Sequence, residues 1–203
     1  MENLFPQKNR ITREKREKLL GQNSFLIWFT GLSGSGKTAI GNLLEYELYS
    51  KGYLTYMLDG DNIRSGLNSN LGFSEEDREE NIRRIGHVAN LFVDAGFIAI
   101  TAFISPFEKD RQLAADIVGK DRFVEIFVNC PIDVCIERDP KNLYKKALNN
   151  EILDFTGISS PYEEPSNPDI SLDTSKLSPQ ESIDKILSYL ENRKLLFPNK
   201  RMV

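Results

Sequence analysis

Hydrophobic and polar residues along the chain fall into blocks that predict a parallel β-sheet covered by helices. Four short runs are almost continuously apolar, which is expected of strands that are buried on both faces. Polar segments with apolar residues at helical spacing separate these runs, and this alternation is typical of the α/β class. The predicted strands are FLIWFT (25–30), YLTYML (53–58), FIAITAFI (97–104) and FVEIFVN (123–129).

End signals mark the helices and the irregular parts of the chain. Ser74 predicts the start of a long helix that Gly96 ends, and Ser178 followed by proline predicts the start of a last helix. The segment 154–178 is rich in Pro, Ser, Gly and Asn, so we expect irregular structure there with at most one short edge strand. Residues 1–22 are expected to form a peripheral arm or helix.

Length, composition and charge narrow the class of protein. The 203 residues suit one domain, and 40% hydrophobic with 28% charged residues is typical of a soluble globular protein. No run approaches the roughly 18 apolar residues of a membrane helix, and the first twenty residues lack the features of a signal peptide. A net charge of −4 lacks the basic footprint of a nucleic-acid-binding protein. We therefore expect a cytoplasmic protein that binds neither membrane nor nucleic acid.

The cysteines and the histidine give no sign of a metal site. Cys130 and Cys135 lie five residues apart, a spacing that fits neither a zinc site nor a redox pair. We expect both to be packing thiols. His87, the only histidine, has no ligand partner at a suitable spacing.

The stretch GLSGSGKT (31–38) has the context that a phosphate-binding loop requires, because it follows a predicted strand and precedes a helical pattern. Its glycines let backbone N–H groups curl around phosphate oxygens, and the helix start adds its positive dipole end. Lys37 is predicted to reach the β- and γ-phosphates, and Thr38 to offer its hydroxyl to Mg²⁺. A flexible Gly/Ser turn would explain the glycines but not the Lys-Thr pair. The predicted ATP-binding residues of this loop are Gly31, Leu32, Ser33, Gly34, Ser35, Gly36, Lys37 and Thr38.

The loop alone leaves three classes of protein open, namely a kinase, a switch GTPase and a mechanical ATPase. The short chain favours a small kinase, and the sequence contains no NKxD-like guanine-binding motif. A kinase also needs an acceptor site, which directs attention to polar residues that follow the other predicted strands.

Two carboxylates follow the second predicted strand in LDGDNIR (58–64). Parallel sheets bind ligands at the carboxyl ends of their strands, so Asp59 and Asp61 are expected to face the phosphates. Either carboxylate could hold Mg²⁺ or accept the proton of an attacking hydroxyl, and Arg64 could bind an acidic acceptor. The alternative is an Asp-Gly turn that caps a solvated helix.

The long helix carries an arginine on its apolar stripe. Arg78 lies four residues before Ile82, and Asn81 follows three residues after Arg78. A guanidinium on a buried stripe indicates an anionic partner. Arg83 and Arg84 fall off the stripe and are expected at the surface.

Three further features near the strand ends have two interpretations each. Ser105 could contact a phosphoryl group or cap the helix that begins near Phe107, and the residues alone favour the cap. The loop aromatics Phe73 and Phe155 could stack on a base or pin their loops to the core, and the residues alone favour pinning. The basic segment ERDPKNLYKKALNNEI (137–152) suits a lid over a phosphoryl group, although each lysine could equally be solvated.

Behind GLSGSGKT, the segments DGDNIR, LGFSEEDREENIRRIG, AFISPFEKDR, RDPKNLYKKA and FTGISSPYEEP follow in order, and together they resemble the adenylylsulfate kinase family. The likeness runs from about Ile11 to the C-terminus. It implies a P-loop NTPase/kinase fold: a five-stranded parallel sheet in the order 2-3-1-4-5, flanked by helices, with a small mobile lid at about 139–157. It also implies transfer of the γ-phosphoryl group of ATP to the 3′-hydroxyl of adenylyl sulfate, which gives 3′-phosphoadenylyl sulfate and ADP in sulfate activation.

The resemblance implies roles for individual residues. Phe73 and Phe155 would sandwich the acceptor's adenine, which replaces the pinning role. Asp61 would bind Mg²⁺ and deprotonate the hydroxyl, and Arg138 would lie near the adenine of ATP. The implied catalytic residues are Lys37, Asp61 and Ser105, the last with a disputed role as a phosphoserine, and the implied metal ligands are Thr38 and Asp61. The implied acceptor-binding residues are Asp59, Arg64, Phe73, Arg78, Asn81, Ile104, Ser105, Phe155 and, from the lid, Lys145.

The sequence departs from the family's pattern at a few positions. Ala39 stands where a second hydroxyl is frequent, His87 where Glu is common, Glu108 where a basic residue is frequent, and Asn142 where Gly is usual. None of these changes removes a group that the mechanism needs. Asn142 is expected to stiffen the lid, and Glu108 to add negative charge near an anionic site.

We expect one kinase domain over residues 23–198, the arm over 1–22 and a tail over 199–203. The resemblance implies a homodimer and allows a sulfurylase partner. Two rivals stay open: another small-molecule P-loop kinase, for example for gluconate, shikimate or a nucleoside, and a nucleotide-binding regulatory module that has lost turnover.

Overall fold

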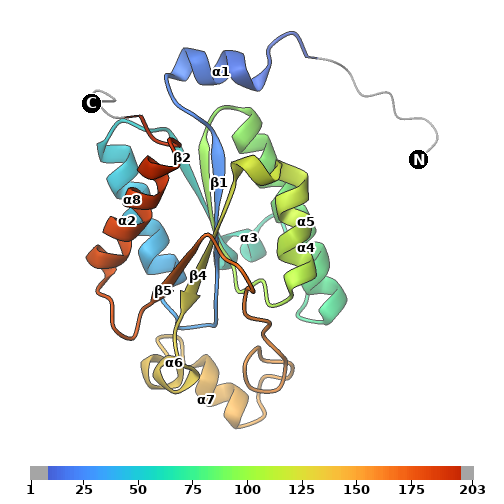
Figure 1. Cartoon of the computed structure of the whole chain (residues 1–203). Coiled ribbons are helices and arrows are strands. Elements are labelled where there is room, and N and C mark those ends of the chain that lie inside the picture. Colours follow the sequence, from blue (N-terminus) through green and yellow to red (C-terminus); the bar gives the residue numbers. More distant parts are fainter. Residues whose placement is uncertain (1–8, 198–203) are drawn as a thin grey trace, which may run out of the picture.

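A sheet of five parallel strands forms the centre of the molecule, with helices on both faces (Figure 1). The computed structural model describes residues 9–197. The strand order is β2-β3-β1-β4-β5, which confirms the predicted fold class and topology. The strands are β1 (Phe25–Thr30), β2 (Thr55–Asp59), β3 (Ile98–Ala102), β4 (Phe123–Asn129) and β5 (Ile170–Asp173).

The predicted strand positions agree with the structure, and the bounds of β1 and β4 agree to the residue. The second strand begins two residues later than predicted, because the N–H of Tyr53 donates to the carbonyl of Leu48 (3.0 Å) in the turn after the preceding helix. The third strand is shorter than predicted at both ends. The single short strand expected within 154–178 is β5, at the edge of the sheet.

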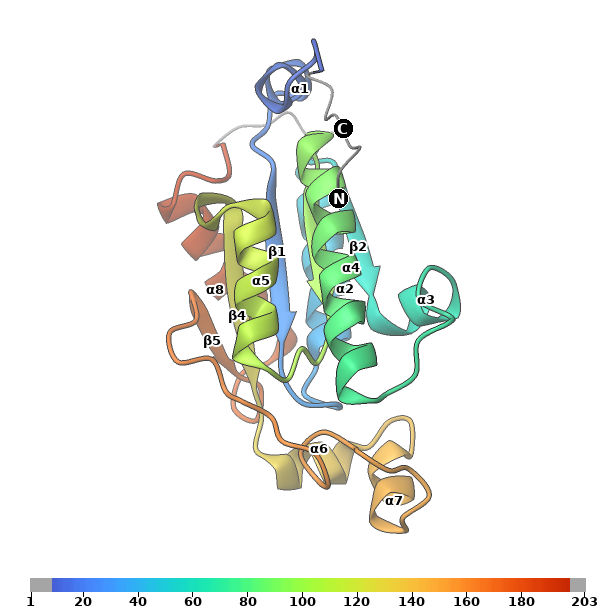
Figure 2. The ribbon, with the colours of Figure 1, turned by 90° about the vertical axis from the view of Figure 1, so that its right-hand side faces the viewer.

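Two pairs of helices cover the sheet. In Figures 1 and 2, α2 and α8 lie on one face and α4 and α5 on the other. Below the carboxyl ends of the strands lie α6 and α7, and α1 lies at the opposite end. The helices are α1 (Arg13–Leu20), α2 (Lys37–Ser50), α3 (Gly60–Ser65), α4 (Glu75–Asp94), α5 (Glu108–Val118), α6 (Ile132–Arg138), α7 (Leu143–Leu148) and α8 (Pro179–Asn192), and a short 3₁₀ helix, η1, spans Lys120–Arg122.

The alternation of side chains along β1 builds a core on each face of the sheet. Ile27 and Phe29 pack into the cluster shared with α2 and α8, and Leu26 and Trp28 into the cluster shared with α4 and α5. All four side chains are fully buried. Burial of such a side chain contributes about 1.5–3 kcal/mol, so this strand anchors the sequence that follows it.

The predicted helix ends are confirmed. Ser74 caps α4 by accepting a hydrogen bond from the N–H of Asp77, and Ser178 forms a complete capping box with Glu181 at α8. Cys130 and Cys135 are both free and buried in a third apolar cluster beneath α6 and α7, which confirms that they pack.

The N-terminal helix α1 lies on the end of the sheet away from the lid. Glu17 accepts hydrogen bonds from the N–H of Ser24 (2.8 Å) and from Arg122 (2.5 Å), and Arg16 pairs with Asp94 (2.8 Å). The predicted arm is therefore helical over Arg13–Leu20. Residues 1–8 and the predicted tail over 199–203 lie outside the described residues.

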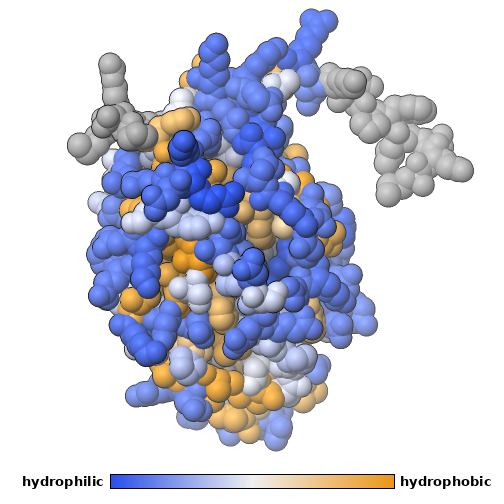
Figure 3. Space-filling view, in the orientation of Figure 1, coloured by the Kyte–Doolittle hydropathy of each residue, from blue (hydrophilic) through white to orange (hydrophobic). Residues whose placement is uncertain are grey.

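The surface is mostly polar on one face of the molecule. Figure 3 shows hydrophilic residues over most of the face it presents, with hydrophobic residues gathered at the lower end where α6 and α7 lie. Within residues 9–197, no helix is both long enough and apolar enough to cross a membrane.

Candidate active site

The phosphate loop joins β1 to α2 at the carboxyl edge of the sheet. Gly31, Gly34 and Gly36 adopt φ values of 147°, 72° and 108°, a region that side chains disfavour. A Cβ atom on Gly31 would lie 2.6 Å from the carbonyl oxygen of Val128 in β4. The glycines are therefore required by the backbone path, and the loop has the geometry that the motif predicts.

Lys37 occupies the centre of this loop. Its Nζ donates to the carbonyls of Gly31 (2.8 Å) and Leu32 (2.7 Å), and only 8% of the residue is exposed. Burial, together with the nearby ammonium of Lys141, lowers the pKa of Lys37 to about 8, while Cys135, Asp59 and Asp61 oppose the shift. The ammonium thus lies where anionic phosphate oxygens would be its strongest partners.

The two aspartates after β2 take different places. Asp59 accepts a hydrogen bond from the Thr38 hydroxyl (2.8 Å) and, as the cap of α3, another from the N–H of Asp61 (3.0 Å). The cap interpretation is therefore confirmed for Asp59, whose carboxylate also contacts the phosphate loop at Thr38. The carboxylate of Asp61 contacts the ammonium of Lys141, which comes from the lid. The sequence identified Lys141 only as one member of a basic run.

The segment 139–157, which the resemblance predicts to be a lid, is attached to the phosphate loop by an aromatic residue, Tyr144, that has no predicted role. The hydroxyl of Tyr144 in α7 donates to the carbonyl of Ser33 (2.9 Å). Asp139 begins the lid helix by accepting from the N–H groups of Leu143 (2.8 Å) and Tyr144 (3.1 Å). The sequence does contain one indication of this contact, namely an aromatic residue between the lysines of the segment. A fully solvated segment would not bury a tyrosine.

Two other predicted residues lie on the lid side. Asn142 has a φ of 54°, which explains in physical terms why glycine suits this position. The Lys145 residue is exposed on α7. Arg138 donates to the carbonyl of Thr174 (2.6 Å), and the Thr174 hydroxyl donates to the carbonyl of Ser35 (2.8 Å), so Arg138 is tied to the phosphate loop through one residue.

A cleft of about 340 Å³ lies between the start of α4 and the loop 154–161. The ring of Phe73 is on this cleft and 64% of the residue is exposed, so pinning to the core does not describe it. The guanidinium of Arg64 stacks on the Phe73 ring, 4.5 Å from its centroid. The cleft is lined by Phe73, Ser74, Glu75, Arg78, Phe107, Asp154, Ser159, Ser160 and Pro161.

Arg78 spans this cleft from α4 to the loop 154–160. Its Nε donates to the carbonyl of Phe73 (2.8 Å), one terminal nitrogen donates to the Thr156 hydroxyl (2.7 Å), and the other donates to the carbonyl of Asp154. Burial lowers the pKa values of Arg64 and Arg78, and the charge of Arg78 lowers that of Arg64 further. Two adjacent guanidiniums with these properties form a site for an anion.

Phe155 and Asn81 are more buried than Phe73. Phe155 is 8% exposed and packs edge-on against the ring of Tyr144, with 5.0 Å between centroids, so in this structure it pins its loop. Asn81 is 3% exposed and accepts a hydrogen bond from the buried amide of Asn68 (2.9 Å). No motif or spacing in the sequence predicts this role for Asn68, because its partner lies thirteen residues away on another element.

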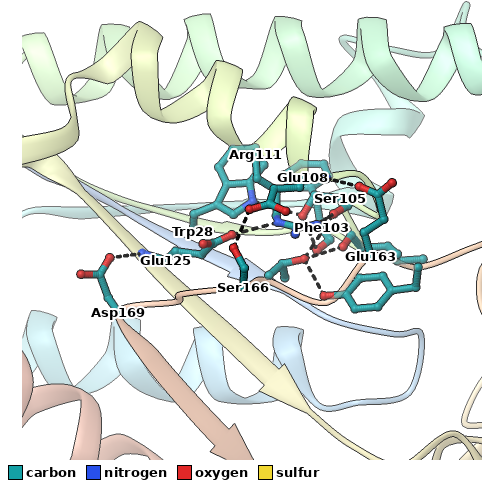
Figure 4. Close-up of polar contacts among 12 residues, drawn as sticks. Trp28, Phe103, Ser105, Glu108, Arg111, Glu125, Glu163, Ser166 and Asp169 are labelled. Carbon is teal, nitrogen blue, oxygen red and sulfur yellow. Dashed lines mark hydrogen bonds and ion pairs between the residues drawn. The ribbon is translucent and has the colours of Figure 1, made fainter.

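The predicted cap role of Ser105 is wrong. The hydroxyl of Ser105 points inward and accepts from Nε1 of Trp28 (3.1 Å), and Pro106 and Phe107 follow before α5 begins. The N–H of Glu108 instead donates to the carboxylate of Glu163 (2.7 Å), which comes from a distant loop (Figure 4). The hydroxyl is drawn inward because the indole N–H of buried Trp28 needs an acceptor.

The strand order, the glycine geometry and the buried lysine define a P-loop kinase fold. A family model described as Adenylylsulphate kinase matches residues 23–173. The chain therefore belongs to the adenylylsulphate kinase family.

Several characterised proteins are similar to this chain over nearly its whole length. The adenylyl-sulfate kinase of Clostridium acetobutylicum is 56% identical over 194 residues, which cover 96% of each chain. That of Clostridium kluyveri is 60% identical over 180 residues, which cover 89% of this chain and 90% of the relative. The Mycobacterium tuberculosis APS kinase, solved in complex with AMPPNP and APS, superposes with a TM-score of 0.81 and 45% identity, over 84% of this chain and 99% of that chain.

Proposed function

We propose that this protein transfers the γ-phosphoryl group of ATP to the 3′-hydroxyl of adenylyl sulfate, which gives 3′-phosphoadenylyl sulfate and ADP. One observation carries the proposal: a phosphate loop with a buried lysine shares its sheet edge with a cleft lined by an exposed aromatic ring, Phe73, and the guanidinium of Arg78, and a second guanidinium, that of Arg64, stacks on the same ring. Such a cleft suits an acceptor with a base and an anionic tail. Membership of the adenylylsulphate kinase family supports the same substrates.

On the donor side, Lys37 and the loop N–H groups hold the triphosphate. The ammonium of Lys37 exchanges its two carbonyl partners for β- and γ-phosphate oxygens, and it remains charged at neutral pH because its pKa is about 8. A donor fixed in a largely buried loop stabilises negative charge that builds up during transfer without having to reorganise. Leu32 and Arg138 complete the proposed ATP site.

The oxygen donors beside the loop fit a magnesium ion. Thr38 and Asp61 are the proposed ligands, and Asp59, which accepts from the Thr38 hydroxyl, adds a second carboxylate. Among residues 9–197, no group of three or more His, Cys, Asp and Glu side chains gathers as a metal cage. One or two carboxylates together with substrate phosphates are what Mg²⁺ commonly uses. When bound, the ion would neutralise charge on the β- and γ-phosphate oxygens.

Asp61 is also the proposed acceptor of the proton from the attacking 3′-hydroxyl. Asp61 lies in the first turn of α3 and its side chain is 73% exposed, so an incoming hydroxyl can approach its carboxylate. The ion pair with Lys141 lets the proposed lid close on the same group. Ser105, with its hydroxyl committed to Trp28, is proposed to shape the acceptor site and not to carry a phosphoryl group.

On the acceptor side, Arg64 and Arg78 are proposed to bind the phosphosulfate, and Phe73 to stack on adenine with Phe155 on its other face. This requires Phe155 to leave its contact with Tyr144, a movement that a lid can supply. The remaining proposed acceptor-binding residues are Asp59, Asn81, Ile104, Ser105 and Lys145.

The assembly and location of the protein are further proposals. We propose a cytoplasmic homodimer, supported by family resemblance, that works alone or with a sulfurylase. A structure described as a hexameric APS kinase from Thiobacillus denitrificans is 31% identical with a TM-score of 0.66, so oligomers occur among similar proteins. Sedimentation of the purified protein tests the dimer.

A substrate panel tests the proposed function. The protein is incubated with Mg-ATP and, separately, with adenylyl sulfate, AMP, gluconate or shikimate, and ADP release is measured. Of the four candidate acceptors, we expect only adenylyl sulfate to raise ADP release far above the blank. Lys37→Met should abolish the rise, and Lys51→Met, an exposed lysine just beyond the end of the same helix, should not. ADP release with adenylyl sulfate no greater than the blank would show the proposal to be wrong.

A further inference from the structure

Ser105 adopts a backbone conformation that its own sequence does not favour. It has a φ of 41° and is 2% exposed. A residue other than glycine in this region costs about 1 kcal/mol or more and persists only where the surroundings hold it. The contacts around residues 104–106, here called the Ser105 turn, therefore decide where the turn lies.

Arg111, in α5, holds the turn by hydrogen bonding. One of its terminal nitrogens donates to the carbonyl of Ser105 (2.8 Å), and Nε donates to Glu125 in β4 (2.9 Å) (Figure 4). Only 2% of the arginine is exposed, so its desolvation is costly and needs good partners. A planar fork makes both contacts at once, whereas the single ammonium of a lysine cannot reproduce that geometry.

A second set of contacts joins the turn to residues 162 and 163, which follow the loop that lines the cleft. The Thr30 hydroxyl bonds to the carbonyl of Ile104 (2.7 Å) and to the phenol of Tyr162 (3.0 Å). Glu163 donates its N–H to the carbonyl of Pro106 (2.8 Å) and accepts from the N–H of Glu108 (2.7 Å). Tyr162 and Glu163, here called the strap, are thus joined to the Ser105 turn, Tyr162 through Thr30 and Glu163 directly.

The strap continues directly from the loop that forms one wall of the cleft. Residues 154–160 carry Phe155 and receive the guanidinium of Arg78, and Pro161 of the cleft wall is next to Tyr162. Within the loop, the carbonyl of Phe155 accepts from three successive N–H groups, so the loop has internal structure and moves as a unit. A displacement of the turn or the strap would therefore displace this wall.

We propose that Arg111 is a positioning residue for the acceptor: it acts through the Ser105 turn and the strap to set the place of the cleft wall at 154–161. The inference rests on the proposed function, since the acceptor is taken to be adenylyl sulfate. Arg111 touches neither the phosphate-loop lysine nor the aspartates, and the turn contacts the phosphate loop through one long hydrogen bond, from the N–H of Gly31 to the carbonyl of Ile104 (3.5 Å). Its replacement should therefore change acceptor binding far more than ATP binding.

The chain offers a matched control in Arg122, which immediately precedes β4. Arg122 also pairs with a glutamate, Glu17 (2.5 Å), and donates to a backbone carbonyl, that of Ser24 (2.8 Å). Each of the two arginines also keeps one buried guanidinium nitrogen without a hydrogen-bond partner among the described residues. Arg122→Lys therefore imposes a comparable structural loss far from the cleft.

The experiment compares Arg111→Lys, Tyr162→Phe and Arg122→Lys with the wild type by steady-state kinetics. We expect the first two to raise the KM for adenylyl sulfate at least threefold while the KM for ATP stays within twofold. Arg122→Lys should leave both constants within twofold. Tyr162→Phe removes one hydroxyl and keeps the ring stacked near Phe127, so it tests the proposal even where Arg111→Lys folds poorly. Unchanged acceptor KM in both variants, or equal rises for both substrates, would overturn the inference.

Amide hydrogen exchange separates this proposal from the proposed function, because it needs no substrate. Peptides covering 154–163 should exchange faster in Arg111→Lys and Tyr162→Phe than in the wild type and in Arg122→Lys. A wild type that does not phosphorylate adenylyl sulfate would contradict the proposed function, and exchange would still decide whether Arg111 holds the wall. Exchange that is the same in all four proteins would refute the positioning role.

Discussion

The buried lysine of the phosphate loop makes ATP binding sensitive to pH. The pKa of Lys37 is lowered to about 8 in the unliganded protein, chiefly by burial. Bound phosphate oxygens favour the charged form and raise that pKa again, so ATP binding above pH 8 requires uptake of one proton. We therefore expect ATP affinity to fall as the pH rises through 8.

The size of the effect follows from the fraction of protein that holds the proton. With a pKa of about 8, the protonated fraction falls about 25-fold between pH 7.5 and pH 9.5, because it changes tenfold per unit once the pH exceeds the pKa. The dissociation constant for ATP should rise by the same factor over this range. The thiol of Cys135 in α6, a helix that packs against the loop at Gly34, has its pKa raised to about 12, chiefly by burial, and stays neutral throughout.

Isothermal titration calorimetry with ATP at several pH values measures this dependence. Titrations at pH 9 in buffers with different ionisation enthalpies should show uptake of close to one proton. Lys37→Arg, which keeps its charge at these pH values, is the control and should show a flat profile. A wild-type dissociation constant for ATP that changes less than threefold between pH 7.5 and 9.5 would refute the reasoning that the buried ammonium of Lys37 binds the phosphates in its charged form.

The same group also affects folding stability. The unfolded chain holds the lysine proton up to its ordinary pKa of 10.5, whereas the folded unliganded protein releases it above about 8. The free energy of unfolding should therefore rise with pH between about 8 and 10.5, by about 3 kcal/mol in total, and this contribution should be constant below pH 8. Urea denaturation compared with Lys37→Met, which lacks the titration, measures the difference in slope.

Three further substitutions test other parts of the account. Arg78→Ala should raise the KM for adenylyl sulfate about 30-fold or more, since truncating one partner of a buried charge pair costs roughly 2–5 kcal/mol. Steady-state kinetics should show the KM for ATP within threefold of the wild-type value. Equal losses for both substrates would indicate misfolding. Phe73→Ala should raise the acceptor KM about 5- to 150-fold, because base stacking contributes about 1–3 kcal/mol, and a thermal melt should stay close to wild type because the ring is exposed. Ile186→Ala, at a fully buried position of α8, should lower the free energy of unfolding in urea by about 2–5 kcal/mol, and a loss below 1 kcal/mol would contradict the described packing.

Most of the fold was predictable because its signals are local. The strands β1 and β4 are continuous apolar runs with polar neighbours, and the bounds of such runs are set by burial alone. The phosphate loop was predictable for the same reason, since Gly31 and Lys37 stand at a spacing that only one backbone path satisfies. The order of the strands was not contained in these patterns and came from resemblance to a family.

The errors and omissions in the site concern partners that are distant in sequence. Ser105 looks like a helix cap from its neighbours, but its acceptor capacity is used by Trp28, and the helix receives its cap from Glu163. The sequence pattern did not point to Asn68, and the aromatic character of Tyr144 did not reveal its partner, because the contacts of both residues are made across elements. Such contacts depend on the assembled fold, and so periodicity and spacing cannot reveal them.

The central claim is that the chain phosphorylates one hydroxyl of one nucleotide. Incubation with Mg-ATP and adenylyl sulfate, followed by ³¹P NMR and mass spectrometry of the product, tests it most directly. The account predicts one new phosphate on the 3′-hydroxyl, with one ADP formed for each product molecule. ATP consumption no greater than in the absence of adenylyl sulfate, or a phosphate attached at any other position, would contradict it.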